Sequence, residues 1–331
     1  MRRKFLLLLL TLVAGLLIGE FGLRVSGLAR PVMRAYVGEF ENRPLGQDFV
    51  ADPVTGWRPR ADHEFRWNLD GREIPYRIDA RGRRIGSAEP ARGPRTLMVA
   101  GDSFSFGVGV LYEESFARRI ADRLGGFELQ NISAPGYGLD QIWLSIREAL
   151  REERPDLLLV GLYPNDFDRS LTAYRELERL NKPLFLLEGG ALRRQTPGDR
   201  PGALALWLER SSRLVAGYRS ADRRLGWTFG LGHWWNLNRS FLEAIQEEGR
   251  RRGVPVVFVY LPSKRWERFP ALERELQESG AHFVNLIELN PERPEGAFFE
   301  DDPHMTASAH ALIGEQVADW ILERGPDVLP E

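Results

Sequence analysis

A serine and a histidine far apart in the chain have the residue context of a nucleophilic catalytic pair. Ser103 stands in a Gly-Asp-Ser tripeptide after an apolar run, and His304 follows a short acidic stretch near the C-terminus. A serine hydroxyl is a weak nucleophile until an imidazole accepts its proton and a carboxylate holds that imidazole in one tautomer. We therefore predict Ser103 as nucleophile, His304 as general base, and Asp301, three positions before the histidine, as the carboxylate that orients it.

Two further segments carry donors that acyl transfer needs for its developing oxyanion. Gly136 has no Cβ, so its backbone N–H can approach a substrate closely. Asn165, which follows the apolar run 157–162, offers a side-chain amide. With the backbone N–H of Ser103, these groups predict an oxyanion hole of three donors. Asp102 and Asp166, beside the nucleophile and the amide, are expected to hold their loops by accepting hydrogen bonds from backbone N–H groups.

These residues together resemble the SGNH, or GDSL, hydrolases. That family carries a Gly-Asp-Ser block, then a glycine, then an asparagine, and finally Asp-x-x-His. Ser103, Gly136, Asn165 and the pair Asp301 and His304 match these positions in the same order, and the resemblance covers residues 96–320. A single short motif would be weak, whereas four in order are specific.

The resemblance implies a three-layer α/β/α, flavodoxin-like fold and a hydrolase that cleaves a carboxylic ester through an acyl-enzyme. Its spacing favours Asp301 over the neighbouring Asp302 as the orienting carboxylate. Two positions depart from the family: Tyr163 replaces the glycine usual before the third-block asparagine, and Ala309 replaces a glycine that relatives often have before a histidine.

Hydrophobic patterning independently predicts an α/β fold. Short apolar runs alternate with amphipathic stretches from residue 96 onward, which is typical of a parallel sheet covered on both faces. Ligands bind such sheets outside the carboxyl ends of the strands, where Ser103, Gly136 and Asn165 are expected. We predict five parallel strands at 96–100, 128–132, 157–162, 254–261 and 282–286, and helices at 114–124, 139–153, 239–252, 270–279 and 307–323.

The N-terminus has the pattern of a membrane signal. Arg2, Arg3 and Lys4 precede the charge-free, leucine-rich run 5–18. A basic flank before an apolar run directs export with the basic side left in the cytoplasm. We predict a single-pass signal anchor at 1–30 with the rest of the chain outside the cytoplasmic membrane, and secretion if the segment is cleaved.

Three further regions follow the anchor. Residues 31–94 predict a small β-rich extension packed on the main domain, and residues 95–325 form the hydrolase domain. Its stretch 168–238 breaks the alternation and is predicted to be an insertion, with a hairpin at 184–192 and a helix at 204–225. Four aromatic residues near its end are expected in the core, at a sugar or at the membrane interface: Trp227, Phe229, Trp234 and Trp235.

Composition excludes several other functions. The formal net charge of −2 and the absence of a basic stripe argue against nucleic acid as a partner. The arginine run 81–84 is interpreted as solvated surface or turn. There is no cysteine, which excludes disulfides, thiolate metal sites and a cysteine nucleophile. No cluster of ligand residues predicts a metal, and no cofactor is expected.

The sequence thus predicts a membrane-anchored serine esterase acting on a small-molecule or glycan ester, such as an O-acetylated glycan or a lipid-like ester. Two alternatives stay open. The same residues would serve an O-acyltransferase that modifies an envelope polysaccharide. A non-catalytic glycan-binding or assembly protein is the other, although the complete set of motif residues argues against it.

Overall fold

A computed structural model describes most of the chain. The described residues are 2–26, 47–87, 93–172, 174–175, 180–195, 204, 207–208, 211–215, 218 and 233–329. They belong to two compact units, one made of Met1–Glu41 and Leu171–Leu237 and the other of Asn42–Ser170 and Asn238–Glu331. All the predicted site residues lie in the second unit.

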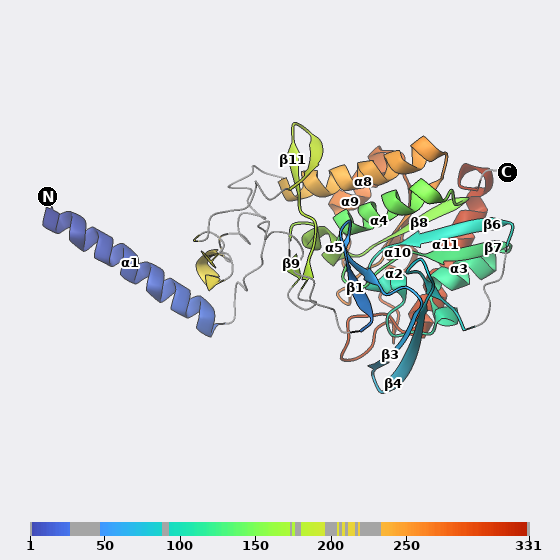
Figure 1. Ribbon diagram of the computed structural model, residues 1–331, viewed down its shortest axis with the longest axis horizontal. Helices are drawn as coiled ribbons and strands as arrows, with labels where there is room; N and C mark the ends of the chain where they lie inside the picture. The colour runs from blue at the N-terminus through green and yellow to red at the C-terminus, as the bar shows by residue number, and fades with distance from the viewer. Residues whose placement is uncertain are drawn as a thin grey trace. The chain divides into compact units, whose positions relative to one another are not determined.

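An eight-stranded mixed sheet forms the centre of the second unit (Figure 1). Strands run in the order β14-β13-β8-β6-β7-β5-β4-β3. The first five are parallel and correspond to the five predicted strands. Their bounds are β6 (Arg95–Ala100), β7 (Phe127–Asn131), β8 (Leu157–Leu162), β13 (Val256–Tyr260) and β14 (His282–Asn285).

The N-terminal extension supplies the other three strands, β3 (His63–Leu69), β4 (Arg72–Ile78) and β5 (Arg84–Ile85), all in antiparallel pairing. The prediction of a five-stranded parallel sheet was therefore wrong in size, and the extension adds to the sheet instead of packing beside it. The extension joins the sheet because β7, the outermost parallel strand on that side, would otherwise be an edge with unpaired N–H and C=O groups. A separate hairpin, β1 (Phe49–Asp52) with β2 (Gly56–Pro59), precedes these strands.

Helices cover both faces of the parallel strands (Figure 1). Side chains alternate along each strand, so Leu97 and Val99 pack toward one face while Met98 points to the other. The first face is covered by α3 (Phe116–Leu124) and α11 (Ala307–Arg324), whose buried side chains share a core with Leu97 and Val99. The other helices of the described residues from 47 onward are α2 (Ser103–Phe106), η1 (Tyr112–Glu114), α4 (Leu139–Glu152), α5 (Pro164–Arg169), α8 (His233–Arg252), α9 (Pro270–Glu278), α10 (Leu286–Leu289) and η3 (Gly325–Asp327).

The first unit contains α1 (Arg2–Val25) and small hairpins of the insertion. The helix α1 is long and apolar enough to cross a membrane. The predicted hairpin is present as β11 (Phe185–Glu188) with β12 (Ala191–Arg194), and a second one pairs β9 (Tyr174–Arg175) with β10 (Leu180–Asn181). Of the predicted helix 204–225, only some residues are described; Trp227 and Phe229 lie outside the described residues.

A buried histidine joins the two helices on the first face. His310 of α11 is fully buried, and its Nδ1 accepts a hydrogen bond from the N–H of Phe116 at 3.1 Å. The two rings also stack. Burial, followed by the charge of Arg84, lowers the pKa of His310 to about 3, so the ring stays neutral at ordinary pH.

Because the unfolded chain protonates His310 near its ordinary pKa and the folded chain does not, acid selectively stabilises the unfolded state. Stability should therefore fall as pH drops from about 6.5 towards 4, by up to ~1.4 kcal/mol per pH unit from this residue. His310→Asn keeps an acceptor for the Phe116 N–H but cannot titrate, so its stability curve should be flatter. Thermal unfolding across this pH range tests the claim, and equal slopes for parent and variant would contradict it.

Candidate active site

Ser103 lies where the central strand β6 ends and the short helix α2 begins. Asp102 is the N-cap of α2, and its carboxylate accepts a hydrogen bond from the N–H of Phe104 at 3.0 Å, as predicted for a loop-holding aspartate. Gly107 ends the helix with φ of 84°, a value that favours glycine. Gly101 has no room for a side chain, because a Cβ there would come within 2.2 Å of the Ser105 hydroxyl. The sharp strand–helix turn thus fixes Ser103 at the carboxyl edge of the sheet.

His304 lies on a loop that is closed at its base by backbone contacts. Phe298 and Met305 pair as an isolated bridge, and the N–H of Phe299 donates to the carbonyl of His304 at 3.1 Å. Lys264 donates to the carbonyl of Glu300 at 2.8 Å on the outer side of the loop. These contacts hold the segment before α11 in one conformation, so the position of His304 is tied to the core.

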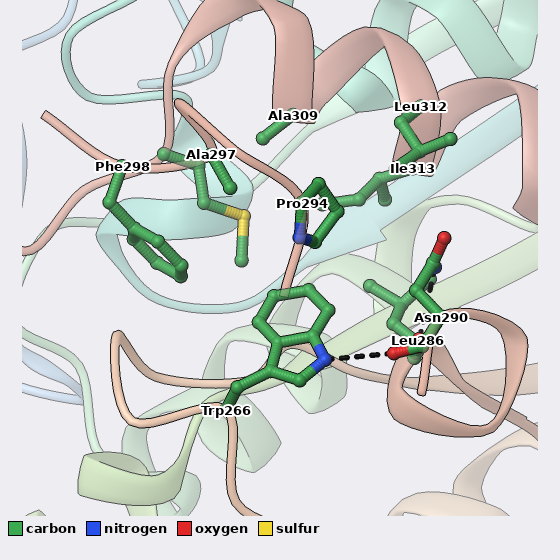
Figure 2. A pocket seen from close by; sticks show the side chains of 10 residues that line it. Trp266, Leu286, Asn290, Pro294, Ala297, Phe298, Ala309, Leu312 and Ile313 are labelled. Atoms are coloured by element: carbon green, nitrogen blue, oxygen red, sulfur yellow. Dashed lines mark hydrogen bonds between the residues drawn. The ribbon is translucent and has the colours of Figure 1, made fainter. Parts of the chain in front are cut away.

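A small apolar cavity lies beneath this loop (Figure 2). Met305, Phe298 and Ile313 contribute to its wall, and Trp266 closes another side with its indole N–H donating to the carbonyl of Asn290 at 2.8 Å. The cavity has about 10 Å³, room for about one water molecule. It is too small for an acyl chain, so it belongs to the packing that supports the loop.

Asp302, and not Asp301, contacts the histidine. The Oδ1 atom of Asp302 lies 2.5 Å from Nδ1 of His304 and accepts the backbone N–H of the same residue at 2.8 Å. Asp301, which the sequence predicts as the orienting residue, is exposed and makes no such contact among the described residues, so Asp302 is the carboxylate that this geometry favours. The carboxylate two positions earlier turns back along the loop to reach both nitrogens, as Asx-turns do.

The charge state of Asp302 fixes the tautomer of the ring. Burial would raise the pKa of Asp302, but hydrogen bonds from the His304 ring and backbone, with the charges of His304 and Lys264, hold it below its ordinary value. An ionised carboxylate only accepts hydrogen bonds, so Nδ1 must carry the proton. With Nδ1 as the donor to Asp302, Nε2 is the nitrogen that a neutral ring would present as a base.

The structure brings the histidine and serine segments together. The ring centroids of His304 and Phe104 are 5.0 Å apart, and Phe104 directly follows Ser103. Gly109, on the loop after α2, is so close to Phe299 that a Cβ at the glycine would meet that ring at 2.6 Å. Within the described part of the chain, Ser103 Oγ and His304 Nε2 make no direct hydrogen bond with each other. Catalytic hydrogen bonds are often long without substrate, and rotation of one side-chain bond moves the Ser103 hydroxyl.

The three predicted oxyanion donors lie on loops at the same edge of the sheet. Gly136 is buried and has φ of 82°, which explains the glycine. Neither its N–H nor that of Ser103 donates to an acceptor among the described residues. Asn165 is exposed in the first turn of α5, so its amide is open to solvent. Both backbone donors and the amide therefore remain available for a ligand.

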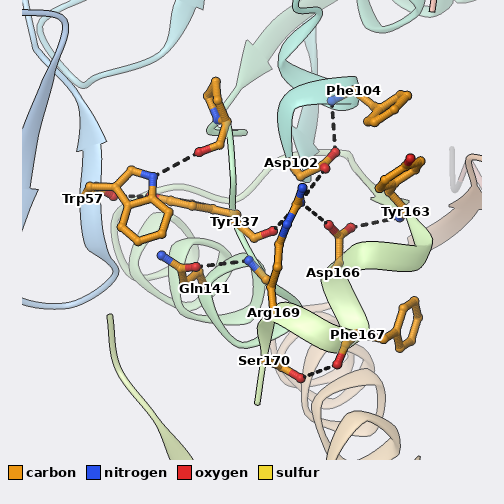
Figure 3. A network of polar contacts seen from close by, with 12 residues as sticks. Trp57, Asp102, Phe104, Tyr137, Gln141, Tyr163, Asp166, Phe167, Arg169 and Ser170 are labelled. Atoms are coloured by element: carbon orange, nitrogen blue, oxygen red, sulfur yellow. Dashed lines mark hydrogen bonds and ion pairs between the residues drawn. The ribbon is translucent and has the colours of Figure 1, made fainter. Parts of the chain in front are cut away.

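Arg169 holds these three loops through one nitrogen (Figure 3). Its Nη1 donates to Asp102 at 2.7 Å, to Asp166 at 2.9 Å and to the carbonyl of Tyr137 at 3.0 Å. Asp102 precedes Ser103, Tyr137 follows Gly136, and Asp166 follows Asn165. A single guanidinium thus joins the serine, glycine and asparagine segments.

The two aspartates of this cluster are almost completely buried. Asp166 accepts the N–H of Tyr163 at 2.9 Å, which agrees with its predicted role in holding the loop. Burial, followed by the charge of Asp102, raises the pKa of Asp166 well above its ordinary value. A proton on this carboxyl group brings two carboxylates and one guanidinium closer to neutrality, which reduces the cost of burying them.

Tyr163, the main departure from the SGNH motif pattern, fills space beside Phe104, the residue after Ser103. Its ring stacks on Phe104 with centroids 4.0 Å apart, so Phe104 contacts Tyr163 on one side and His304 on another. Burial, followed by the charge of Asp102, raises the pKa of Tyr163 to about 12. The tyrosine is therefore neutral and forms part of an aromatic wall where a glycine would leave a gap.

The prediction that Arg84 is a solvated surface or turn residue was wrong. Instead of being solvated, it is buried, and its guanidinium donates to the carbonyls of Phe106, Gly107 and Val110 at 2.6–2.7 Å. It also lies over the ring of Tyr76. Burial lowers the pKa of Arg84 to about 10, which still leaves it charged at neutral pH. This arginine of the N-terminal extension thus holds the loop that follows α2, the helix that begins at Ser103.

No group of three or more histidine, cysteine or acidic side chains suited to a metal occurs among the residues that the structure describes.

Comparison with known proteins finds similarity only to solved structures; no family model and no curated protein matches the chain. The structure of TesA is 15% identical, covering 69% of this chain and 98% of that one, with a TM-score of 0.41. The esterase EstA from Pseudoalteromonas sp. is 14% identical over 69% of this chain and 97% of its own, with a TM-score of 0.43. A family 3 carbohydrate esterase from Clostridium thermocellum is 12% identical over 71% and 98%, with a TM-score of 0.41.

Neighbouring aspartates provide a matched test of the histidine contact. Asp302→Asn should leave the fold intact but favour the wrong imidazole tautomer, lowering kcat by about 10³–10⁴-fold as in other triads. Asp301→Asn changes an exposed side chain and should leave kcat nearly unchanged. Steady-state kinetics on both variants measure the two kcat values. A large loss of kcat in Asp301→Asn with little loss in Asp302→Asn would show that Asp301 orients His304.

Replacing Arg169 tests the loop cluster. Arg169→Met leaves two buried carboxyl groups without their cation and should cost about 3–5 kcal/mol of stability. It should also lower kcat/KM, because three site loops lose their common partner. Arg151→Met, which removes an exposed ion pair with Glu148, is the matched control and should change both quantities little. Similar effects of the two substitutions, measured by urea unfolding and ester hydrolysis, would refute the role of Arg169.

Proposed function

We propose that the protein is a serine hydrolase of the SGNH type that cleaves a carboxylic ester. The observation that carries the proposal is the His304 ring, paired through Nδ1 with Asp302 and packed on the residue that follows Ser103. The ordered motif residues and the solved esterases of similar fold agree with it but do not identify the substrate.

In the first half-reaction, Ser103 Oγ attacks the acyl carbonyl while His304 Nε2 accepts the hydroxyl proton. The negative charge on the carbonyl oxygen is stabilised by the N–H groups of Ser103 and Gly136 and by the Asn165 amide. His304 then returns the proton to the departing alcohol. The second half-reaction repeats these roles with water, which the same nitrogen deprotonates, and releases the carboxylic acid and free Ser103.

The proposed setting is the outer side of the cytoplasmic membrane. The helix α1 has an apolar surface that is exposed along nearly its whole length, and its first three residues, Arg2, Arg3 and Lys4, are basic. Such a surface is unstable in water and stable in lipid, with its basic end on the cytoplasmic side. An ester of an envelope glycan or a lipid-like ester is the substrate class that a catalytic unit held there would meet.

The test of function is hydrolysis of aryl and glycan esters of increasing acyl length by the full chain in detergent. Ser103→Ala should retain the fold and lose ~10³-fold or more in turnover. Ser105→Ala is the matched control, since Ser105 lies two residues later in α2 and its buried hydroxyl has no partner among the described residues. It should therefore keep normal activity.

A fluorophosphonate should label residue 103 in the parent and in Ser105→Ala. It should not label Ser103→Ala. Equal hydrolysis by Ser103→Ala and the parent would refute the mechanism. If the acyl-enzyme forms but the acyl group passes to an added sugar instead of water, the protein is a transferase on the same residues.

A further inference from the structure

The C-terminal part of α1 is contacted by a distant segment of the insertion. Glu20 accepts hydrogen bonds from the Ser212 hydroxyl at 2.8 Å and from the N–H groups of Arg213 and Leu214, each at 2.9 Å. Arg24, one turn further along α1, pairs with Glu20 and donates to the carbonyl of Ser211 at 2.5 Å. The insertion therefore meets the helix through a compact set of polar contacts.

The adjoining surface of α1 fits this segment. A Cβ on Gly19 would lie 3.3 Å from the Leu214 side chain, so the glycine allows close approach. Gly19, Glu20 and Leu23 are the partly covered residues of α1, while the other described residues of the helix are exposed. The covered patch thus coincides with the polar contacts, and the rest of the helix surface is left for lipid.

The position of Glu20 along the helix sets the depth of this contact in a membrane. The charge-free run 5–19 precedes it, which at ~1.5 Å per residue spans roughly 22 Å of a hydrocarbon core of about 30 Å. Glu20 consequently lies near the far boundary of that core. A carboxylate at such a depth needs protein partners, and residues 212–214 supply three donors.

The residues on either side of this contact expose apolar side chains. Leu204 is 70% exposed, Trp207 60% and Tyr218 45%. Tryptophan and tyrosine favour the membrane interface, because one part of each side chain is apolar and the other is polar. The surrounding sequence 204–225 holds five arginines and two acidic residues, a balance that suits anionic headgroups.

We propose that Leu204, Trp207 and Tyr218 lie in the outer interface of the lipid bilayer, held there by the contacts of residues 211–214 with Glu20 and Arg24 of the anchor helix. This inference rests on the proposed membrane anchoring by α1 but not on the proposed hydrolysis. The insertion becomes a second membrane contact besides α1 itself.

This second contact is linked to the catalytic unit at both ends of the insertion. Its first end follows directly after α5, and its second end enters α8. The Ser170 hydroxyl donates to Asn238 at 2.7 Å, and the Asn238 amide donates to the carbonyl of Phe167 at 3.0 Å, so the two ends are joined at the base of α5. The base of α5 is therefore the place where the insertion leaves the second unit and rejoins it.

The absence of cysteine from the chain makes single-site labelling straightforward. Leu204→Cys would be labelled with an environment-sensitive NBD fluorophore and the full chain reconstituted into vesicles of phosphatidylethanolamine and phosphatidylglycerol that contain a headgroup-proximal nitroxide lipid. Glu278→Cys, on the exposed side of α9, is the matched control. We expect strong quenching at position 204 and little at position 278.

Glu20→Ala in the Leu204→Cys chain tests the contact itself. It makes α1 more apolar, so the chain should still float with vesicles, while quenching at position 204 should largely be lost. Quenching at 204 that equals that at 278 in a chain that floats would overturn the inference while leaving the anchor intact. Full quenching in Glu20→Ala would overturn the role of Glu20. A chain that does not float would refute the anchor and this inference together, whereas ester hydrolysis is measured independently.

Discussion

The ionic cluster of Arg169 with Asp102 and Asp166 is the interaction on which the geometry of the site depends. Parallel strands end at one edge of the sheet, but their loops are free to diverge beyond it. One buried nitrogen binds groups beside Ser103, Gly136 and Asn165, and so fixes the three loops relative to one another. Burying these charges is costly, which is consistent with the raised pKa of Asp166. The cluster therefore serves the arrangement of the loops more than the stability of the fold.

His304 is positioned mainly by apolar contacts instead of by ionic ones. Its loop is anchored by buried Met305, and its ring packs on Phe104, which in turn stacks on Tyr163. Such packing restricts the ring plane, while the hydrogen bond to Asp302 selects the tautomer. Polar contacts thus position the proposed oxyanion donors, and aromatic packing positions the proposed base. The two sets of contacts meet at α2, where the N-cap Asp102 and Phe104 flank Ser103.

Much of the fold follows from local sequence patterns. The strand at Leu157–Leu162 is where the apolar run predicted it, and the other four parallel strands agree to within two residues at each end. The strands β8 and β13 are buried throughout, so a continuous apolar run is sufficient to identify them, whereas burial alternates along β7. The extension was harder to predict, because alternation identifies a strand but not its partner. The pairing of Arg84 with Asn131, which joins the extension to the sheet, has no local signal.

The candidate site shows the same limit of sequence patterns. Motif order names Ser103, His304, Gly136 and Asn165 as candidates, whereas the contact of His304 with Asp302 instead of Asp301 depends on the irregular backbone of one loop. Arg169 carried a usable signal, since it stands three residues after Asp166 on a helix, where side chains are neighbours. Arg84 carried no sequence signal. Its partners are backbone carbonyls, which any residue supplies, so the sequence does not distinguish it from a surface arginine.

The most direct test of the proposed site is a crystal structure of the protein after reaction with an alkyl fluorophosphonate. The account predicts a phosphorus–oxygen bond at Ser103, with one phosphoryl oxygen within hydrogen-bond distance of the N–H groups of Ser103 and Gly136 and of the Asn165 amide. His304 Nε2 should face the leaving-group side. An adduct whose oxygen points away from these donors, or a reagent that bonds elsewhere and leaves Ser103 unmodified, would contradict it.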